Sequence, residues 1–131
     1  MGRNAVIAEL EKALADEASV AAAYLFGSYA RGDFREGSDI DLGVVFKELP
    51  PKVLLGPVSD VHGRLETALN REIDLVAMND APVDLVHRIL RDGVLVNEGD
   101  PSTRVAFEVK ARNEYFDLKP YLDEYRSGSS A

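Results

Sequence analysis

Residues 27–42 read GSYARGDFREGSDIDL, and this stretch lies between two apolar runs. The first run, residues 20–26 (VAAAYLF), has no polar face of helical period and stops at Gly27, so we expect a buried strand that ends there. The second run begins at Asp39 and becomes uniformly apolar by Phe46, which predicts a central strand. Between them we expect a short helix starting near Tyr29 and a polar loop.

Two carboxylates open the second strand. Asp39 and Asp41 are two residues apart, so both point to one face of a sheet, whereas Ile40 and Leu42 point to the other. Adjacent carboxylates repel and dehydrate each other, which is costly unless a cation lies between them. Hard oxygen ligands of this kind suit Mg²⁺ or Mn²⁺. A pair of solvated aspartates at a strand end remains the alternative, because a D-x-D pattern alone is common.

The glycine-serine turn is the second feature of the stretch. Gly27 ends a strand and opens a helix start, where backbone N–H groups point outward. These donors and the Ser28 hydroxyl suit phosphate oxygens, and Arg31 and the Ser38 hydroxyl could add contacts. The alternative is an ordinary strand-to-helix turn that needs a small residue for packing.

Two-metal phosphoryl chemistry calls for a third carboxylate. Asp74 lies inside the apolar run of residues 72–76 (EIDLV), which predicts a strand that could pair beside the Asp39–Asp41 strand. An aspartate in such a run needs a partner. Glu72 shares its face and competes for the role; we favour Asp74 because Glu72 is nearer the strand end.

The rest of the chain alternates helices and strands. Helical periodicity covers residues 6–14, 57–69, 81–92 and 101–115, and further strands are expected at 72–78 and 94–96. The last helix could continue past Pro120 as a second piece. The pattern predicts one α/β domain over residues 1–126, with a mixed sheet of about four strands flanked by helices, and a disordered tail at 127–131. It does not fix the strand order.

Composition narrows the class of protein. The 131 residues are 46% hydrophobic and contain no cysteine, which excludes disulfides and thiolate metal sites. A net charge of −8 argues against direct nucleic-acid binding through a basic face. We find no signal-peptide pattern and no apolar run long enough for a membrane span, so we expect a cytoplasmic protein.

The spacing of these motifs resembles a known superfamily. Gly27-Ser28, ten residues, Asp39-x-Asp41 and a later Asp74 in a strand are similar to the motif of DNA polymerase beta-type nucleotidyltransferases. Within that superfamily, the short chain and its GSYARG form resemble the minimal nucleotidyltransferases (MNT), the antitoxins of HEPN/MNT toxin–antitoxin pairs. The resemblance implies a polymerase beta-like fold, Mg²⁺ held by Asp39, Asp41 and Asp74, and a triphosphate against Gly27, Ser28 and Ser38.

The activity that the resemblance implies is transfer of AMP from ATP to a hydroxyl, as on a tyrosine, of a HEPN toxin. No segment suggests a second substrate domain, which makes a protein acceptor attractive. One alternative is an antitoxin that neutralises its partner by binding alone. Another is transfer to a small molecule such as an aminoglycoside.

Several residues outside the motif are assigned no catalytic role or have two alternative roles. His62 and His87 fall on expected helices without a ligand partner at metal spacing, so we assign them ordinary helix positions. The C-terminal aromatic residues either pack on the domain's own core or form a partner surface. This aromatic cluster comprises Tyr115, Phe116, Tyr121 and Tyr125.

Overall fold

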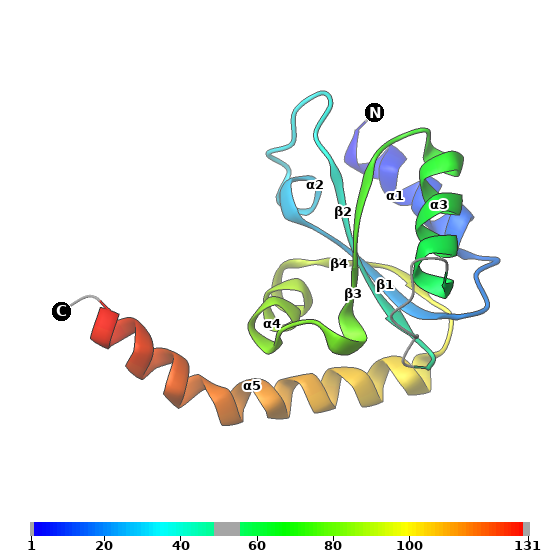
Figure 1. The fold of residues 1–131 in the computed structure, drawn as a ribbon. Coiled ribbons are helices and arrows are strands. Elements are labelled where there is room, and N and C mark those ends of the chain that lie inside the picture. Colours follow the sequence, from blue (N-terminus) through cyan, green and yellow to red (C-terminus); the bar gives the residue numbers. More distant parts are fainter. Residues whose placement is uncertain (1, 49–55, 130–131) are drawn as a thin grey trace.

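The computed structural model describes residues 2–48 and 56–129. Helices and strands alternate along them (Figure 1). The elements are α1 (Arg3–Leu14), β1 (Val20–Phe26), α2 (Gly27–Arg31), β2 (Ile40–Phe46), α3 (Pro57–Leu69), β3 (Ile73–Ala77), the 3₁₀ turn η1 (Met78–Asp80), α4 (Val83–Asp92), β4 (Val94–Glu98) and α5 (Pro101–Ser129). Each expected element is present, with ends within a few residues of the prediction except at the C-terminal end of α5, which extends well beyond the expected residue 115.

The four strands form one mixed sheet in the order β3-β2-β1-β4. β1 runs antiparallel to both of its neighbours, whereas β2 and β3 are parallel. The register aligns Phe26 with Asp41 and Asp41 with Asp74, so these three residues form one row across the sheet. The expected pairing of the Asp74 strand beside the Asp39–Asp41 strand is therefore confirmed.

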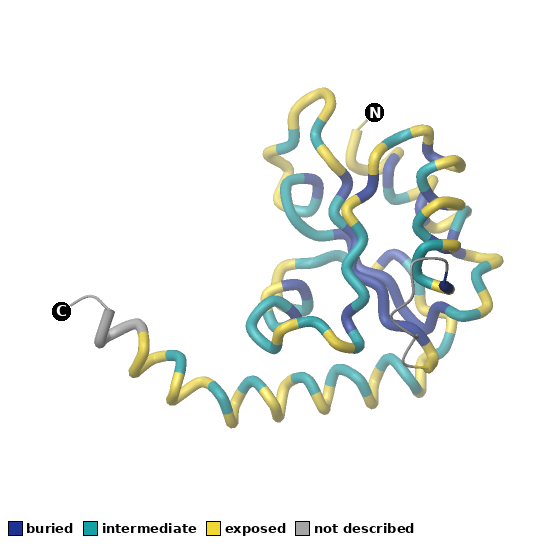
Figure 2. Tube along the Cα trace, in the orientation of Figure 1, coloured by how far each residue is buried: buried dark blue, intermediate teal, exposed yellow. Residues whose placement is uncertain are grey.

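Helices cover both faces of the sheet. On one face, α1 and α3 bury a core that includes Leu10, Leu65, Ile40 and Leu42. On the other face, α4 and the first half of α5 pack over a smaller core around Tyr24. Figure 2 shows the buried strands enclosed between these helical layers. The two cores fix the sheet and leave one end of it available for a site.

The start of β3 is held by α3. His62 Nε2 lies 2.6 Å from the Ile73 carbonyl oxygen and 3.3 Å from the Glu66 carboxylate. Glu66 in turn accepts the Ile73 N–H at 2.9 Å. His62 is thus a helix residue that satisfies backbone groups of an edge strand, as its helix position suggested.

The C-terminal helix extends well beyond the body of the domain. α5 continues through Pro120 as one helix, where we expected a break, and it changes direction along its C-terminal part (Figure 1), as a proline inside a helix favours. It includes residues 127–129, which we expected to be disordered; residues 130 and 131 lie outside the described residues. Across the described ranges, no helix is both long and apolar enough to cross a bilayer.

Candidate active site

The three aspartates lie at one end of the sheet. Ile40 and Leu42 are fully buried against α1 and α3, whereas Asp41 is only half-buried and Asp39 is exposed just before β2 begins. Asp74 is exposed on the neighbouring strand, directly opposite Asp41. The alternation of strand side chains therefore does bring the carboxylates to one face, as the sequence predicts. The face is open, so Asp74 is less buried than its apolar neighbours suggested.

The surroundings of Asp41 shift the pKa of its carboxyl group. Burial raises the pKa of Asp41 above its ordinary value, and the negative charges of Asp74 and Asp39 raise it further. A hydrogen bond shared with Asp74 acts in the same direction, and Arg31 opposes the shift only in part. An unbalanced cluster of this kind gains stability from a proton or from a cation.

Gly27 packs directly against Asp41. Its φ is +70°, in the left-handed region that glycine tolerates. A Cβ at this position would overlap the Asp41 side chain, whose carboxyl carbon would lie 2.9 Å away. Ser28 follows at the start of α2, half-buried, and its carbonyl accepts the Gly32 N–H at 2.9 Å. The turn therefore needs glycine for its backbone and for its contact with a carboxylate, a contact that sequence reasoning did not anticipate.

Arg31 and Ser38 have contacts within their own loop. Arg31 Nε lies 3.2 Å from Asp33 Oδ2, with both side chains largely exposed. The Ser38 hydroxyl accepts the Arg35 N–H at 2.8 Å and so helps to close the loop. The Ser38 oxygen accepts this bond, and its O–H group can donate to another acceptor. The structure thus gives Ser38 a loop-forming contact that the sequence alone did not indicate.

A cavity of about 200 Å³ lies between α2 and α4, and Gly27 forms part of its wall. Its lining combines apolar side chains with Arg31, Arg88 and Asp92. Arg88 and Asp92 come from α4 and had no role in the sequence prediction, because only the packing of α4 on the sheet brings them beside the turn. The cavity offers an apolar wall and positive charge next to the carboxylates.

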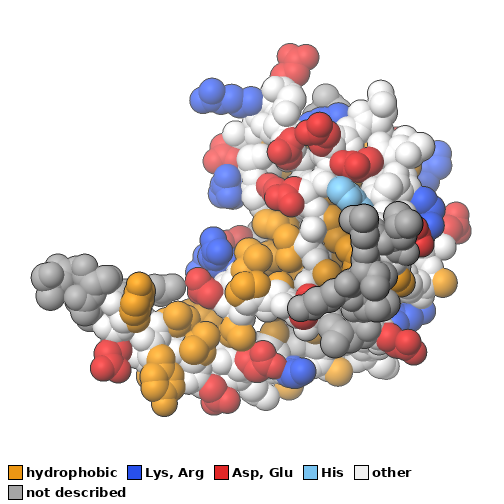
Figure 3. All heavy atoms as spheres, in the orientation of Figure 1, with side chains coloured by type: hydrophobic (Ala, Val, Ile, Leu, Met, Phe, Trp, Pro, Cys, Tyr) orange, Lys and Arg blue, Asp and Glu red, His pale blue; other side chains and the backbone are white. Residues whose placement is uncertain are grey.

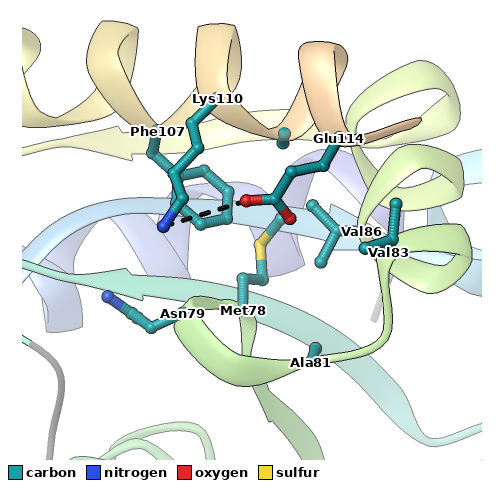
Figure 4. Close-up of a pocket in the computed structure, with 9 residues that line it drawn as sticks. Met78, Asn79, Ala81, Val83, Val86, Phe107, Lys110 and Glu114 are labelled. Carbon is teal, nitrogen blue, oxygen red and sulfur yellow. Dashed lines mark ion pairs between the residues drawn. The ribbon is translucent and has the colours of Figure 1, made fainter. Parts of the chain in front are cut away.

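A second cavity, of about 220 Å³, lies between α5 and the η1–α4 segment (Figure 4). Met78, Val86 and Phe107 form its apolar wall, and Lys110 and Glu114, one turn apart on α5, form an ion pair at 3.8 Å beside it. None of the three aspartates lines it. It is a gap in helix packing rather than part of the carboxylate site.

The carboxylates suit a divalent cation by chemistry, although they are not yet gathered around one point. Among residues 2–48 and 56–129, no three acidic or histidine side chains converge closely enough to enclose a metal. Asp41 and Asp74 are nevertheless in contact, Asp39 acts on the same group, and all three supply hard oxygen donors. The bare Cα of Gly27 lets the Asp41 carboxylate lie directly against the turn. The residues therefore fit a magnesium or manganese site.

Residues 8–102 match the model of the polymerase beta nucleotidyltransferase family. The chain belongs to this family. Protein adenylyltransferase MntA of Thermococcus cleftensis is 30% identical over 93 residues, which cover 71% of this chain and 91% of that protein. A Methanocaldococcus jannaschii relative is 36% identical over 74 residues, which cover 56% of this chain and 83% of the relative. The nucleotidyltransferase assignment made from the motif is therefore confirmed.

Solved structures share the fold of this nucleotidyltransferase over nearly its whole length. A toxin–antitoxin structure with AMP-PNP matches with a TM-score of 0.77 at 24% identity, covering 95% of this chain and 98% of that one. A Shewanella oneidensis structure of tri-AMPylated HEPN toxin with MNT antitoxin matches with a TM-score of 0.72 at 22% identity, covering 98% and 99%. At these identities the likeness establishes the fold, and it confirms the predicted polymerase beta-like architecture.

Proposed function

We propose that this nucleotidyltransferase transfers AMP from ATP to a tyrosine hydroxyl of a HEPN-type partner and so acts as its antitoxin. The observation that carries the proposal is the pairing of Asp41 with Asp74, with the Gly27 turn packed against Asp41 and the charge of Asp39 acting on the same group. The similarity to an adenylyltransferase named MntA supports ATP and a protein acceptor. The likeness to complexes with AMP-PNP and with an AMPylated HEPN toxin supports the same substrate and partner.

The reaction forms one bond and breaks one. The acceptor oxygen bonds to the α-phosphorus of ATP, the bond from that phosphorus to the bridging oxygen of the β-phosphate breaks, and pyrophosphate leaves with the electron pair. The acceptor loses its proton to a base or to water. Catalysis of this kind depends mainly on positioning and on neutralising charge.

Each motif residue has a proposed role. Asp39, Asp41 and Asp74 hold Mg²⁺, for which Mn²⁺ can substitute, and Asp74 also helps to take the acceptor proton. When bound, the metal neutralises phosphate charge and lowers the pKa of the attacking hydroxyl. Gly27 and Ser28 face the triphosphate with their backbone and hydroxyl donors. Arg31, the Ser38 O–H and Arg88 supply further contacts, and Arg31 and Arg88 do so from the cavity between α2 and α4.

The role of Asp74 can be separated from that of Glu72. Asp74→Asn should lower kcat much more than it changes KM for ATP, because help to the acceptor hydroxyl is realised mainly in the transition state. Glu72→Gln is the matched control, since Glu72 is equally exposed but precedes β3. A large rate loss in the Glu72 variant with a normal Asp74 variant would reverse the assignment.

The exposed part of the C-terminal aromatic cluster is our candidate docking surface for the partner. Tyr115 stacks on His87 of α4 with ring centroids 3.5 Å apart, so it belongs to the domain's own packing. Phe116, Tyr121 and Tyr125 are 61%, 69% and 75% exposed. Figure 3 shows apolar side chains along this helix away from the acidic end of the sheet. Phe116→Ser with Tyr121→Ser should weaken the complex, whereas Lys119→Ala on the same helix should not.

Intact-mass spectrometry tests the activity directly. The chain, its cognate HEPN protein, ATP and Mg²⁺ are incubated together, and the HEPN protein should gain the mass of one or more AMP units. A tight complex without added mass would favour an antitoxin that acts by binding alone. Neither complex nor added mass would favour a small-molecule acceptor.

A further inference from the structure

Arg71 joins three segments that each carry part of the candidate site. Its Nη2 donates to the Tyr29 hydroxyl at 2.9 Å and also to the Ser38 carbonyl. Tyr29 belongs to α2, which begins with Gly27; Ser38 directly precedes Asp39. Arg71 itself lies just before β3, on which Asp74 stands. The Arg71 guanidinium therefore links α2 and the loop before Asp39 to the segment that leads into β3, the strand that bears Asp74.

The contacts at Tyr29 are well ordered by packing. Tyr29 is 1% exposed and stacks on Phe34 with centroids 4.3 Å apart and ring planes 12° from parallel. The Arg71 guanidinium carbon lies 5.6 Å from the Tyr29 ring centroid, within the range of a cation–π contact. A rigid planar guanidinium with several N–H donors suits such a junction better than a flexible ammonium does.

The loop held by Arg71 is anchored at its ends by backbone bonds from the Asp33 N–H to the Ser28 carbonyl and from the Ile40 N–H to the Glu72 carbonyl. A hollow of about 370 Å³ lies beneath residues 35–37, lined also by Gly2, Tyr29, Phe34 and Arg71. Gly37 has a φ of +83°, and the loop closes on itself through Ser38 and Arg35 rather than through the body. Between these ends, the Arg71–Ser38 bond and the Tyr29–Phe34 stack help to hold the loop above this hollow.

We propose that Arg71 is a positioning residue that sets the distance between the Gly27-Ser28 turn and the Asp39–Asp41 carboxylates. It does not touch the nucleotide or the metal in this assignment; it acts through Tyr29 and Ser38. The inference rests on the proposed nucleotidyl transfer, because the groups it positions are those assigned to metal and triphosphate. Without it, α2 and the Asp39 loop would lose their shared side-chain anchor on the segment before β3.

The test compares Arg71→Met, Arg71→Lys and Arg64→Met. Arg71→Met keeps the aliphatic stem but loses every hydrogen bond, and it should lower kcat roughly 10- to 100-fold, as misplaced reacting groups do, with a smaller change in KM for ATP. Arg71→Lys should recover part of the loss, since an ammonium can still donate. Arg64→Met, which removes the ion pair with Glu17 far from the loop, should keep wild-type kinetics.

Hydrogen exchange gives a readout that does not depend on activity. In Arg71→Met, amides of residues 28–39 should exchange faster while those of α5 keep their wild-type rates. Combining Arg71→Met with Tyr29→Phe should add little to either effect, because both remove the same bond. Wild-type kcat and exchange in Arg71→Met, or an equal rate loss in Arg64→Met, would overturn the proposal. A wild-type chain that transfers no AMP refutes the proposed function instead, and the exchange experiment still decides whether Arg71 holds the loop.

Discussion

Two clusters of ionisable groups lie on the same face of the sheet and differ in how their charges are balanced. The acidic cluster is Asp39, Asp41 and Asp74. The helix-anchoring network is Tyr24, Glu98, Arg104 and Glu108. In the sheet, Tyr24 pairs with Gly43 and Phe26 pairs with Asp41. Tyr24 and Phe26 are two residues apart on β1 and point to the same face, so the two clusters are neighbours along this strand.

Every member of the helix-anchoring network has a partner. The Tyr24 hydroxyl donates to Glu108 at 2.6 Å, Arg104 pairs with Glu108 at 2.8 Å, and Arg104 also contacts Glu98. Burial and Glu108 together raise the pKa of Tyr24 far above its ordinary value, so it stays protonated as a donor. These bonds fasten α5 to the sheet. The two carboxylates share the Arg104 guanidinium, so each charge in the network has a partner of opposite sign.

The acidic cluster, in contrast, has three negative groups and only partial compensation from Arg31. Folding gains nothing from gathering like charges, and burial of Asp41 adds a further cost. The comparison shows charges paired for structure in one cluster and left largely uncompensated in the other, and it supports our proposal that the uncompensated carboxylates bind a ligand that supplies positive charge. The two regions should therefore respond to mutation in opposite ways.

The strongest test removes the acidic cluster's charge. Asp39→Asn with Asp41→Asn should reduce AMP transfer roughly 10³-fold or more, as loss of groups that organise phosphate charge does. Thermal unfolding should stay at the wild-type midpoint or rise, because like-charge repulsion is relieved. Transfer is measured by intact mass, and unfolding by circular dichroism. Wild-type transfer in the double variant would remove both residues from the site.

The next test addresses the glycine turn that borders the acidic cluster. Gly27→Val should lower transfer roughly 10²- to 10³-fold by displacing preorganised donors, and destabilise the fold by about 1–3 kcal/mol through its positive φ. Gly32→Val is the matched control, since Gly32 also has a positive φ of +86° but no atom within 4 Å of an added Cβ. Backbone strain alone would affect both variants alike; contact with Asp41 predicts that only Gly27→Val loses nucleotide binding by calorimetry.

The helix-anchoring network should show the opposite pattern. Glu108→Ala leaves the Tyr24 hydroxyl without its acceptor and leaves Arg104 paired with Glu98 alone, and it should cost about 1–3 kcal/mol of unfolding free energy. Binding of Mg²⁺ and an ATP analogue should not change at a temperature where the variant is folded. Glu114→Ala, which removes a more exposed pair with Lys110, should cost less than about 1 kcal/mol. A Glu108 variant that loses nucleotide binding but keeps wild-type stability would contradict the separation between a structural network and a binding cluster.

The smallest effect expected is on pH dependence. The pKa of Asp41 is raised in the fold, so the folded state holds its proton more tightly than the unfolded state does. Its contribution to stability is therefore most favourable at low pH, and is lost as pH rises from the unfolded value of about 3.9 through the raised one. Mg²⁺ competes with this proton, so the rise in unfolding midpoint on adding Mg²⁺ should increase over the same range. Asp41→Asn should abolish that increase, as followed by thermal melts between acidic and neutral pH.

The sequence by itself determined the local features of this site. An abrupt end to an apolar run located the end of β1, because glycine and polar residues interrupt a buried strand. Alternation along β2 placed Asp39 and Asp41 opposite Ile40 and Leu42, because strand side chains have a period of two. The motif spacing was sufficient for the family as well. These inferences depend only on neighbours in the chain.

Tertiary structure alone decided which distant residues meet. The parallel register that sets Asp74 against Asp41 depends on α3 docking and on the contacts of His62 and Glu66, which no local pattern encodes. The same packing brings Arg71 under the Asp39 loop. The C-terminal helix continues through Pro120 where propensity predicted a break, so local preference did not decide its length. Backbone geometry fixes the local periodicity of helices and strands. Strand register and contacts between elements depend instead on burial summed over the whole fold, so only the folded chain shows them.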